Sequence, residues 1–211
     1  MNPILSFLYV IGLYGAFTAG TFRLRASSAQ FSNRIPRATL LMTLAIAIPS
    51  TFQFFFPTLL HLFERDLSRI AAGEWWRVVT ALFVQDGGIA GSLFNLVSLL
   101  LLGSVAEQRW GSRRWLFIFL VGGILSQFIA FLWQPMGAGN SVANFSLAGS
   151  MAMSCLISAP RPARIASVMS LAACSVLLAL KDIHGAAAFI GCIIALVLIW
   201  QERNQPSKIS N

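Results

Sequence analysis

Long apolar stretches recur along the whole chain and are separated by short polar connections. Most are roughly 17 to 20 residues long, which is the length that a helix needs to cross a hydrocarbon core of about 30 Å. Unpaired backbone groups cannot face lipid, and the stretches are too uniformly apolar for barrel strands, so we expect α-helices. The seven predicted membrane helices cover residues 4–19, 38–56, 89–105, 115–133, 141–157, 165–180 and 183–200.

The composition supports a membrane protein. Hydrophobic residues make up 57% of the 211 positions, charged residues only 10%, and the mean hydropathy is +0.75. A soluble domain of this length does not reach such values. No basic residue precedes the first apolar stretch and no clear cleavage site follows it, so we expect a retained anchor and not a signal peptide. The predicted fold class is an all-α polytopic membrane protein.

The basic side chains collect on every second connection, which predicts how the chain is oriented in the membrane. With the amino terminus outside and the carboxyl terminus in the cytoplasm, eleven of the fifteen Lys and Arg residues are cytoplasmic and five of the seven acidic residues are outside. The net charge of +8 therefore reflects topology, and nucleic acid is not an expected partner. A compact chain of this kind suits a bacterial inner membrane. The cytoplasmic set comprises Arg23, Arg25, Arg34, Arg37, Arg109, Arg113, Arg114, Arg161, Arg164, Arg203 and Lys208.

Ser141 and His184 open the fifth and seventh predicted helices, at the same side of the membrane. The residues at helical spacing after each of them are mostly small, which allows two helices to approach closely. A serine hydroxyl within reach of an imidazole is the arrangement used in nucleophilic catalysis. Taken alone, Ser141 is typical of a helix N-cap and His184 of an interface anchor or a packed polar residue.

Four separated motifs occur in a fixed order between residues 73 and 191. Together they resemble the motifs of the rhomboid family of intramembrane serine proteases. In chain order they are Gly73-Glu74-Trp75-Trp76-Arg77; Asn95 followed by Gly103-x3-Glu107-x3-Gly111; Gly139-Asn140-Ser141; and Asp182-Ile183-His184 followed by Gly191.

The resemblance implies a rhomboid-like six-helix core, formed by the second to seventh predicted helices, with one extra N-terminal transmembrane helix. Residues 1–37 would hold that helix and its basic connection, residues 38–200 the core and residues 201–211 a short cytoplasmic tail. It further implies that Ser141 is the nucleophile and His184 the general base and acid, in a dyad without an aspartate. Asn95 and Gly139 would support the oxyanion. Asp182, two residues before the histidine, is expected to point away to the water interface.

Two departures from the family pattern bear on activity. Gly91 stands where the family has a histidine four residues before Asn95, and losing one oxyanion donor costs on the order of 100- to 1000-fold in rate. Gln85 and Ser92 are candidate substitutes for that donor. Val142 replaces a glycine after the serine and should narrow the space near it.

The predicted function is hydrolysis of peptide bonds in or near transmembrane segments of membrane-protein clients. The expected partners are transmembrane proteins and the lipid bilayer, and no metal or organic cofactor is implied. Trp76 and Arg77 are expected to brace the outer loop. The alternative is a rhomboid-like pseudoprotease that binds transmembrane helices without cleaving them, for which Gly91 is the main support. A small transporter or channel has less support, because the helices lack the intramembrane charges of such sites.

Overall fold

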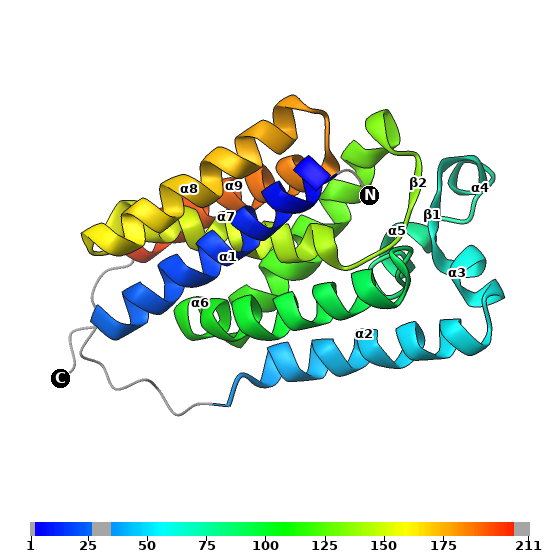
Figure 1. Cartoon of the computed structure of the whole chain (residues 1–211), viewed down its shortest axis with the longest axis horizontal. Helices are drawn as coiled ribbons and strands as arrows, with labels where there is room; N and C mark the ends of the chain where they lie inside the picture. Colours follow the sequence, from blue (N-terminus) through cyan, green and yellow to red (C-terminus); the bar gives the residue numbers. More distant parts are fainter. Residues whose placement is uncertain (1–2, 27–34, 205–211) are drawn as a thin grey trace.

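The computed structural model describes residues 3–26 and 35–204. Two of the expected cytoplasmic cations, Arg34 and Lys208, lie outside these ranges. Six of the described helices are long and apolar enough to cross a membrane (Figure 1). The prediction of an all-α polytopic membrane fold is confirmed. The six helices are α1 (Pro3–Ala26), α2 (Arg37–Phe55), α6 (Gly88–Trp133), α7 (Ser141–Ser158), α8 (Arg161–Ala179) and α9 (Ile183–Asn204).

The helix α6 supplies two of the seven predicted spans. A straight helix of its 46 residues would be about 69 Å long, which is more than twice the hydrocarbon thickness of about 30 Å. It is broken at Gly111, whose φ of 73° and ψ of 158° lie outside the helical region and suit a residue without a side chain. Beyond the break, the indole N–H of Trp115 donates to the carbonyl of Gly103 at 3.0 Å. The two arms of α6 therefore fold back on each other.

The carboxylate of Glu107 ties the start of α2 to the turn of α6. It accepts hydrogen bonds from the backbone N–H groups of Ala38 at 3.0 Å and Thr39 at 2.8 Å, and from the hydroxyls of Thr39 and Ser112. The first N–H groups of a helix lack intrahelical partners and attract negative charge, so a carboxylate is well suited to this position. The glutamate of the second motif thus has a structural role.

Helix α7 lies at the centre of the bundle and packs against α1, α6, α8 and α9 (Figure 1). Its approach to α9 is so close that backbone atoms of each helix face a glycine of the other. A Cβ at Gly149 would lie 1.9 Å from the carbonyl oxygen of Ala188, and a Cβ at Gly191 would lie 1.9 Å from that of Ser146. The predicted close packing of these two small faces is confirmed.

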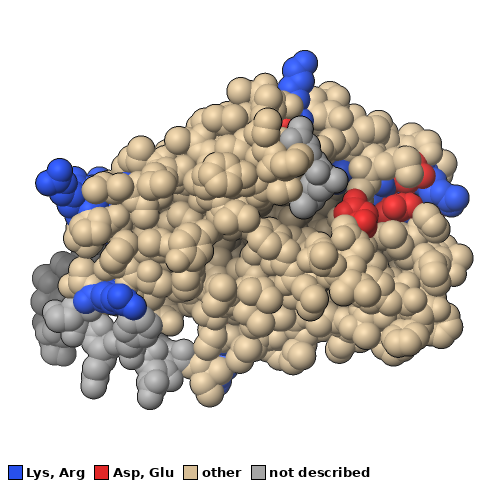
Figure 2. All heavy atoms as spheres, viewed as in Figure 1, with Lys and Arg blue, Asp and Glu red and all other residues tan. Residues whose placement is uncertain are grey.

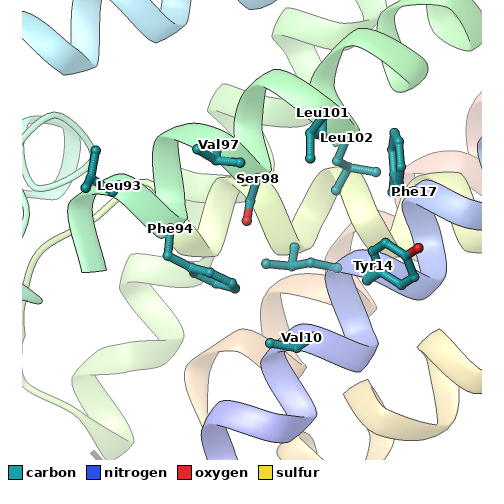
Figure 3. Close-up of a pocket in the computed structure, with 10 residues that line it drawn as sticks. Val10, Tyr14, Phe17, Leu93, Phe94, Val97, Ser98, Leu101 and Leu102 are labelled. Carbon is teal, nitrogen blue, oxygen red and sulfur yellow. The ribbon is translucent and has the colours of Figure 1, made fainter. Parts of the chain in front are cut away.

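Helix α1 packs against α8, α7 and the first arm of α6. Toward α8 the contact is tight, because the hydroxyl of Ser170 donates to the carbonyl of Gly12 at 2.6 Å. Toward α6 a groove of about 340 Å³ remains, with the hydroxyl of Ser98 pointing into it (Figure 3). Helix α1 is therefore anchored on the side of α8. The groove is lined by Val10, Leu13, Tyr14, Phe17, Leu93, Phe94, Val97, Ser98, Leu101 and Leu102.

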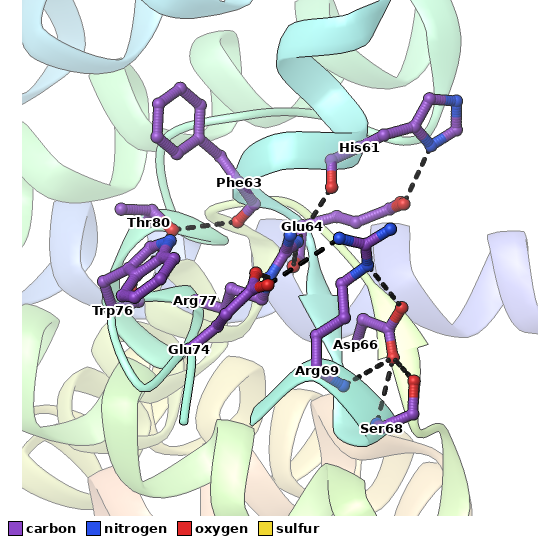
Figure 4. A network of polar contacts seen from close by, with 10 residues as sticks. All are labelled: His61, Phe63, Glu64, Asp66, Ser68, Arg69, Glu74, Trp76, Arg77 and Thr80. Carbon is purple, nitrogen blue, oxygen red and sulfur yellow. Dashed lines mark hydrogen bonds and ion pairs between the residues drawn. The ribbon is translucent and has the colours of Figure 1, made fainter. Parts of the chain in front are cut away.

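The long connection between α2 and α6 is folded into short elements, several of which surround the buried Arg77. These are α3 (Thr58–Phe63), β1 (Arg65–Asp66), α4 (Leu67–Ala71) and α5 (Arg77–Thr80). Arg77 is only 1% exposed and binds the Glu74 carboxylate at 2.6 Å and the carbonyls of His61 and Glu64 at 2.8 and 3.0 Å (Figure 4). Arg77 therefore braces the loop as expected, whereas the side chain of Trp76 is largely exposed.

Polar contacts gather at the two ends of the bundle. At one end, Arg109 and Arg114 bind Glu202, and Arg23 binds the carbonyls of Ser154 and Ser158. The other end carries Ser141, His184 and the loop between α2 and α6. Across the face in Figure 2, a broad uncharged surface lies between these regions. Such a band fits a chain that spans the bilayer several times.

Candidate active site

The structure brings Ser141 and His184 into direct contact. Ser141 is the first residue of α7 and His184 the second residue of α9. The Oγ of Ser141 and the Nε2 of His184 are 2.8 Å apart, which is a hydrogen-bond distance. The close packing of Gly149 and Gly191 further along the two helices holds these helix starts together.

Asp182 also belongs to the site, and the expectation that it faces the water interface is wrong. Its side chain is buried, and its Oδ1 lies 2.7 Å from the Nδ1 of His184 and accepts the backbone N–H of His184 at 2.9 Å. The rule that residues two apart diverge applies within a helix, whereas Asp182 precedes α9 and bends back over its first turn. The imidazole thus has an aspartate partner on the side opposite Ser141.

The charge of Asp182 fixes which nitrogen of the imidazole carries the proton. Burial raises the pKa of Asp182, but hydrogen bonds from His184 and Tyr9 and the attraction of the imidazole outweigh it, so the pKa is lower than usual. An ionised carboxylate only accepts hydrogen bonds, so the Nδ1 of His184 has to be the donor. The Nε2 is then free to accept the proton of the Ser141 hydroxyl.

Two aromatic rings lie against the imidazole. The ring centroid of Tyr9, from α1, is 4.5 Å from that of His184, and the ring of Phe145, from α7, is 5.0 Å away. The hydroxyl of Tyr9 donates to the second carboxylate oxygen of Asp182 at 2.6 Å. The imidazole is therefore held by rings as well as by its two nitrogens.

A closed set of amide side chains lies beside the serine. Asn95 donates to the side-chain oxygen of Gln85 at 2.8 Å, and Gln85 donates to that of Asn140 at 2.8 Å. The side chain of Asn140 donates to the side-chain oxygen of Asn144 at 3.1 Å, and that of Asn144 donates to the backbone carbonyl of Asn95 at 2.9 Å. One amide hydrogen of Asn95 remains outside this ring of bonds, because its NH₂ group has two donors.

Gly139 lets these amides come close to Ser141. Its φ of 140° lies in the region that favours glycine. A Cβ there would lie 3.2 Å from the Oε1 of Gln85, 3.4 Å from the Nδ2 of Asn95 and 3.5 Å from the Oγ of Ser141. The site residues expected from the sequence, Ser141, His184, Asn95 and Gly139, are therefore gathered in one place.

The two candidate substitutes for the missing histidine have other partners. The hydroxyl of Ser92 donates its hydrogen to the carbonyl of Gly88 at 2.7 Å, and Gln85 belongs to the amide ring. A Cβ at Gly91 would meet no atom within 4 Å. The space in which a side chain at position 91 would stand is therefore open.

A cavity of about 430 Å³ opens onto Ser141 and His184. Arg65 braces its wall: the guanidinium donates to the carbonyls of Gln134 at 2.7 Å and Met136 at 3.1 Å and to the side chain of Gln127. The strand β1 also pairs with β2 (Met136–Gly137) in an antiparallel register. Burial lowers the pKa of Arg65 to about 10, so it remains charged at neutral pH. The wall comprises Arg65, Asp86, Gln127, Gln134, Pro135, Met136, Gly137, Ala138, Gly139, Ser141, Val142, Ile183 and His184.

The sequence interpretation missed Arg65, Tyr9 and the role of Asp182. A signal existed for Asp182, because aspartate directly before a helix commonly caps its first N–H groups. The other two residues lie far along the chain from Ser141, and their contacts arise only from the tertiary fold.

Comparisons with known proteins identify relatives of this chain. A family model described as the rhomboid domain matches residues 72–205. Rhomboid protease GluP of Bacillus subtilis (strain 168) is 37% identical over 95 residues, which are 44% of this chain and 18% of that protein. Putative rhomboid protease YdcA of the same organism is 31% identical over 83 residues, 38% of this chain and 41% of that protein. Rhomboid-like protease 3 of Toxoplasma gondii is 34% identical over 81 residues, 37% of this chain and 30% of that protein.

Each matched segment spans less than half of the relative's own length. The family model, in contrast, covers more than half of this chain and includes the outer loop from residue 72, both arms of α6, and α7 to α9. Helices α1 and α2 precede the matched range. On the extent of this match, the chain belongs to the rhomboid family.

Proposed function

We propose that this protein is an intramembrane serine protease that hydrolyses peptide bonds in or near the transmembrane segments of membrane-protein clients. The observation that carries the proposal is the 2.8 Å contact between the Oγ of Ser141 and the Nε2 of His184, beside a cavity. A hydroxyl within hydrogen-bond reach of a base, whose second nitrogen is itself oriented, is the arrangement of an activated nucleophile.

The proposed reaction follows from this geometry. The Oγ of Ser141 attacks the scissile carbonyl carbon while its proton moves to the Nε2 of His184. The imidazolium then gives that proton to the leaving amine, the C–N bond breaks, and an ester on Ser141 remains. The same Nε2 takes a proton from water, whose oxygen attacks the ester, and the proton returns to the Oγ of Ser141 as the acid is released.

The oxyanion would be stabilised by the backbone N–H of Ser141 and the free amide hydrogen of Asn95. The Nδ2 of Asn95 lies close to the position of a Gly139 Cβ, as does the Oγ of Ser141. Gly91 contributes no side chain to this set. We therefore expect a working enzyme whose rate is below that of one with a third donor.

The client reaches Ser141 at one end of the bundle. A peptide bond inside a helix is shielded from attack, so a client helix has to unwind locally and small or helix-breaking residues are expected near the cleavage site. We assign this end to the outer face of a bacterial inner membrane, because Arg23, Arg109 and Arg114 lie at the opposite end. The amino terminus would then be outside and the carboxyl terminus in the cytoplasm.

The main support for the alternative of a pseudoprotease is Gly91. A protein that only binds membrane helices has no need for a serine hydroxyl at 2.8 Å from an imidazole nitrogen. We therefore do not favour this alternative, and a test of nucleophile reactivity distinguishes it from the protease.

The test is labelling of the detergent-solubilised protein with a fluorophosphonate probe, which reacts with activated serines. We expect labelling of the wild type and none in Ser141→Ala or His184→Ala. Matched controls are Ser175→Ala, an exposed serine on α8, and His61→Ala, which changes the chain's other histidine, whose exposed ring is on the outer loop. Both controls should label like the wild type. A folded wild type that does not label would contradict the proposal.

A further inference from the structure

Helix α1 reaches into the site through one side chain. The hydroxyl of Tyr9 donates to the Oδ2 of Asp182 at 2.6 Å, across 173 positions of sequence. Its ring lies against the imidazole of His184 with 4.5 Å between centroids and 54° between planes. Helix α1 precedes the range matched by the family model, so this contact comes from outside the matched region.

The packing of α1 on α8 fixes where Tyr9 stands. Gly12 follows Tyr9 by three residues and so lies on the same face of the helix. Its carbonyl accepts the hydroxyl of Ser170 at 2.6 Å, and a Cβ at Gly12 would lie 3.0 Å from the ring of Phe145. The turn that carries Tyr9 is therefore packed against α8 and α7. Moving Tyr9 away from Asp182 would break the hydrogen bond between Ser170 and Gly12.

Both oxygens of Asp182 are occupied. Oδ1 accepts from the Nδ1 and the backbone N–H of His184, and Oδ2 accepts from Tyr9. Asp182 is only 3% exposed, so water hardly reaches it. A buried carboxylate with an unsatisfied oxygen is costly, and hydrogen bonds to a charged group are stronger than those between neutral groups. Tyr9 thus supplies the hydrogen bond that water would otherwise provide.

We propose that Tyr9 and Asp182 are positioning residues, which hold the imidazole of His184 with its Nε2 toward Ser141 and thereby make the N-terminal helix a working part of the site. This inference rests on the proposed protease function. Asp182 keeps the proton on Nδ1 and stabilises the imidazolium that forms when Ser141 loses its proton. Tyr9 acts one step further out by orienting the carboxylate, as partners of an orienting group do in other sites.

The pH dependence of labelling depends on the groups that contact the imidazole of His184. The titratable side chains that contact the imidazole among the described residues are Asp182, from the link before α9, and Tyr9, from α1. Helix α7 contributes Ser141 and Phe145, and α8 presents the backbone of Leu178 and Cys174 to the neighbouring Gly185. A difference in pH profile between the wild type and Asp182→Asn therefore reports on the contact between Asp182 and His184.

The test measures the rate of fluorophosphonate labelling across pH, with the maximal rate kept separate from probe affinity. Asp182→Asn should lower the maximal rate by about 100- to 10,000-fold, since the same change in a Ser-His-Asp triad favours the wrong tautomer. Its acid limb should move to lower pH, because the imidazolium loses a negative neighbour. Tyr9→Phe keeps the ring and the carboxylate and should lower the maximal rate by roughly ten-fold, with probe affinity unchanged. Tyr14→Phe, the same change on the same helix at an exposed tyrosine, is the matched control.

A double mutant shows whether Tyr9 acts through Asp182. In the Asp182→Asn background, Tyr9→Phe should have almost no further effect, whereas independent roles would make the two effects multiply. Multiplicative effects, or a Tyr9→Phe protein that labels like the wild type, would overturn the proposal. Faster labelling of Tyr9→Phe would also overturn it and would mark α1 as a restraint on the site.

Failure of this inference can be told apart from failure of the proposed function. A wild type that labels and a Ser141→Ala that does not would uphold the protease, whatever Tyr9→Phe does. If the wild type does not label, an NMR titration of the ¹⁵N-labelled imidazole still measures the contact with Asp182. A pKa of His184 that is identical in the wild type and in Asp182→Asn would then refute the positioning role.

Discussion

Replacing Gly149 by alanine should separate α7 from α9 and thereby disable the site at their ends. The added Cβ would lie 1.9 Å from the carbonyl oxygen of Ala188 and 2.6 Å from its carbonyl carbon, whereas ordinary contacts begin at 3.4 Å. The obstructing atoms belong to the backbone and cannot rotate away. The two helices therefore have to move apart by about 1.5 Å, and overpacking of this kind costs about 1–3 kcal/mol, or more, in stability.

The same movement acts on the proposed nucleophile and base. Ser141 begins α7 and His184 begins α9, with 2.8 Å between their reacting atoms. A shift of the full 1.5 Å would bring the Oγ to Nε2 distance to roughly 4.3 Å, and even half of it would exceed hydrogen-bond range. Because a misplacement of about 1 Å can cost 100-fold in rate, we expect at least that loss.

The assay combines the rate of fluorophosphonate labelling with thermal unfolding in detergent. Gly191→Ala should behave like Gly149→Ala, because its Cβ would lie 1.9 Å from the carbonyl of Ser146 on the facing helix. Gly91→Ala controls for the stability effect of the substitution itself, since its Cβ would meet nothing within 4 Å. If Gly149→Ala unfolded at the wild-type temperature and labelled at the wild-type rate, the link between helix packing and the site would be refuted.

Three further changes test other parts of the structure. Gly91→His places an imidazole one helical turn before Asn95, where a Cβ meets no atom within 4 Å, and should raise kcat for a model transmembrane peptide by about ten-fold or more, with KM little changed; an unchanged kcat would argue against a missing donor. Arg77→Met removes the hydrogen bonds to two loop carbonyls and to the Glu74 carboxylate and should destabilise the protein by about 3 kcal/mol, measured as a fall in Tm that an exposed Arg69→Met does not share. The pKa of Asp182 is lower in the folded than in the unfolded protein, so the ionised carboxylate stabilises the fold above about pH 4, and this stabilisation is lost as the pH falls through the pKa of the folded state. Asp182→Asn should therefore flatten the decline in Tm at acid pH. An unaltered decline would assign it to other carboxylates.

The spans could be predicted from the sequence because each is a separate local pattern of apolar residues. The third and fourth predicted spans are the two arms of α6 on either side of the break at Gly111. The end of the first arm could not be predicted. The third predicted span ends at residue 105, whereas the first arm of α6 continues through Glu107 and Arg109 to the break at Gly111. Those charges are tolerated because Glu107 binds the start of α2 and Arg109 binds Glu202, and both partners are distant in sequence.

The short elements of the outer loop were not predicted for a related reason. Each of them has at most six residues, too few for a periodic apolar face, and the buried Arg65 and Arg77 fix parts of the loop. Arg77 donates hydrogen bonds to the carbonyls of His61 in α3 and Glu64 just after it. Arg65 donates to the carbonyls of Gln134 and Met136, in the segment before α7. Such contacts depend on the complete fold, and a local pattern does not encode them.

The part of the candidate site that could be predicted consists of residues whose position along a helix sets their depth in the membrane. Ser141 and His184 are at helix starts on the same side of the membrane, and their neighbours are small, so their proximity followed from local features and from the resemblance. Asp182 was misplaced because helix geometry was applied to a residue that lies before the helix. Lys181 has a φ of 57°, a left-handed conformation that turns the chain just before Asp182, and no pattern in the sequence signals it.

The arrangement of the site leaves one side of Ser141 and His184 open. Tyr9 from α1 and Phe145 from α7 lie against the imidazole, and Asp182 occupies its Nδ1. The cavity opens on the remaining side, where Gly139, Val142 and the segment that includes β2 form its wall. If Ser141 is the nucleophile, the scissile carbonyl has to approach from this cavity and not along α1. The side chain of Val142 then stands beside the residue next to the cleaved bond, and Val142→Gly should widen the range of side chains accepted there, as competition between peptides that differ only at this residue would measure.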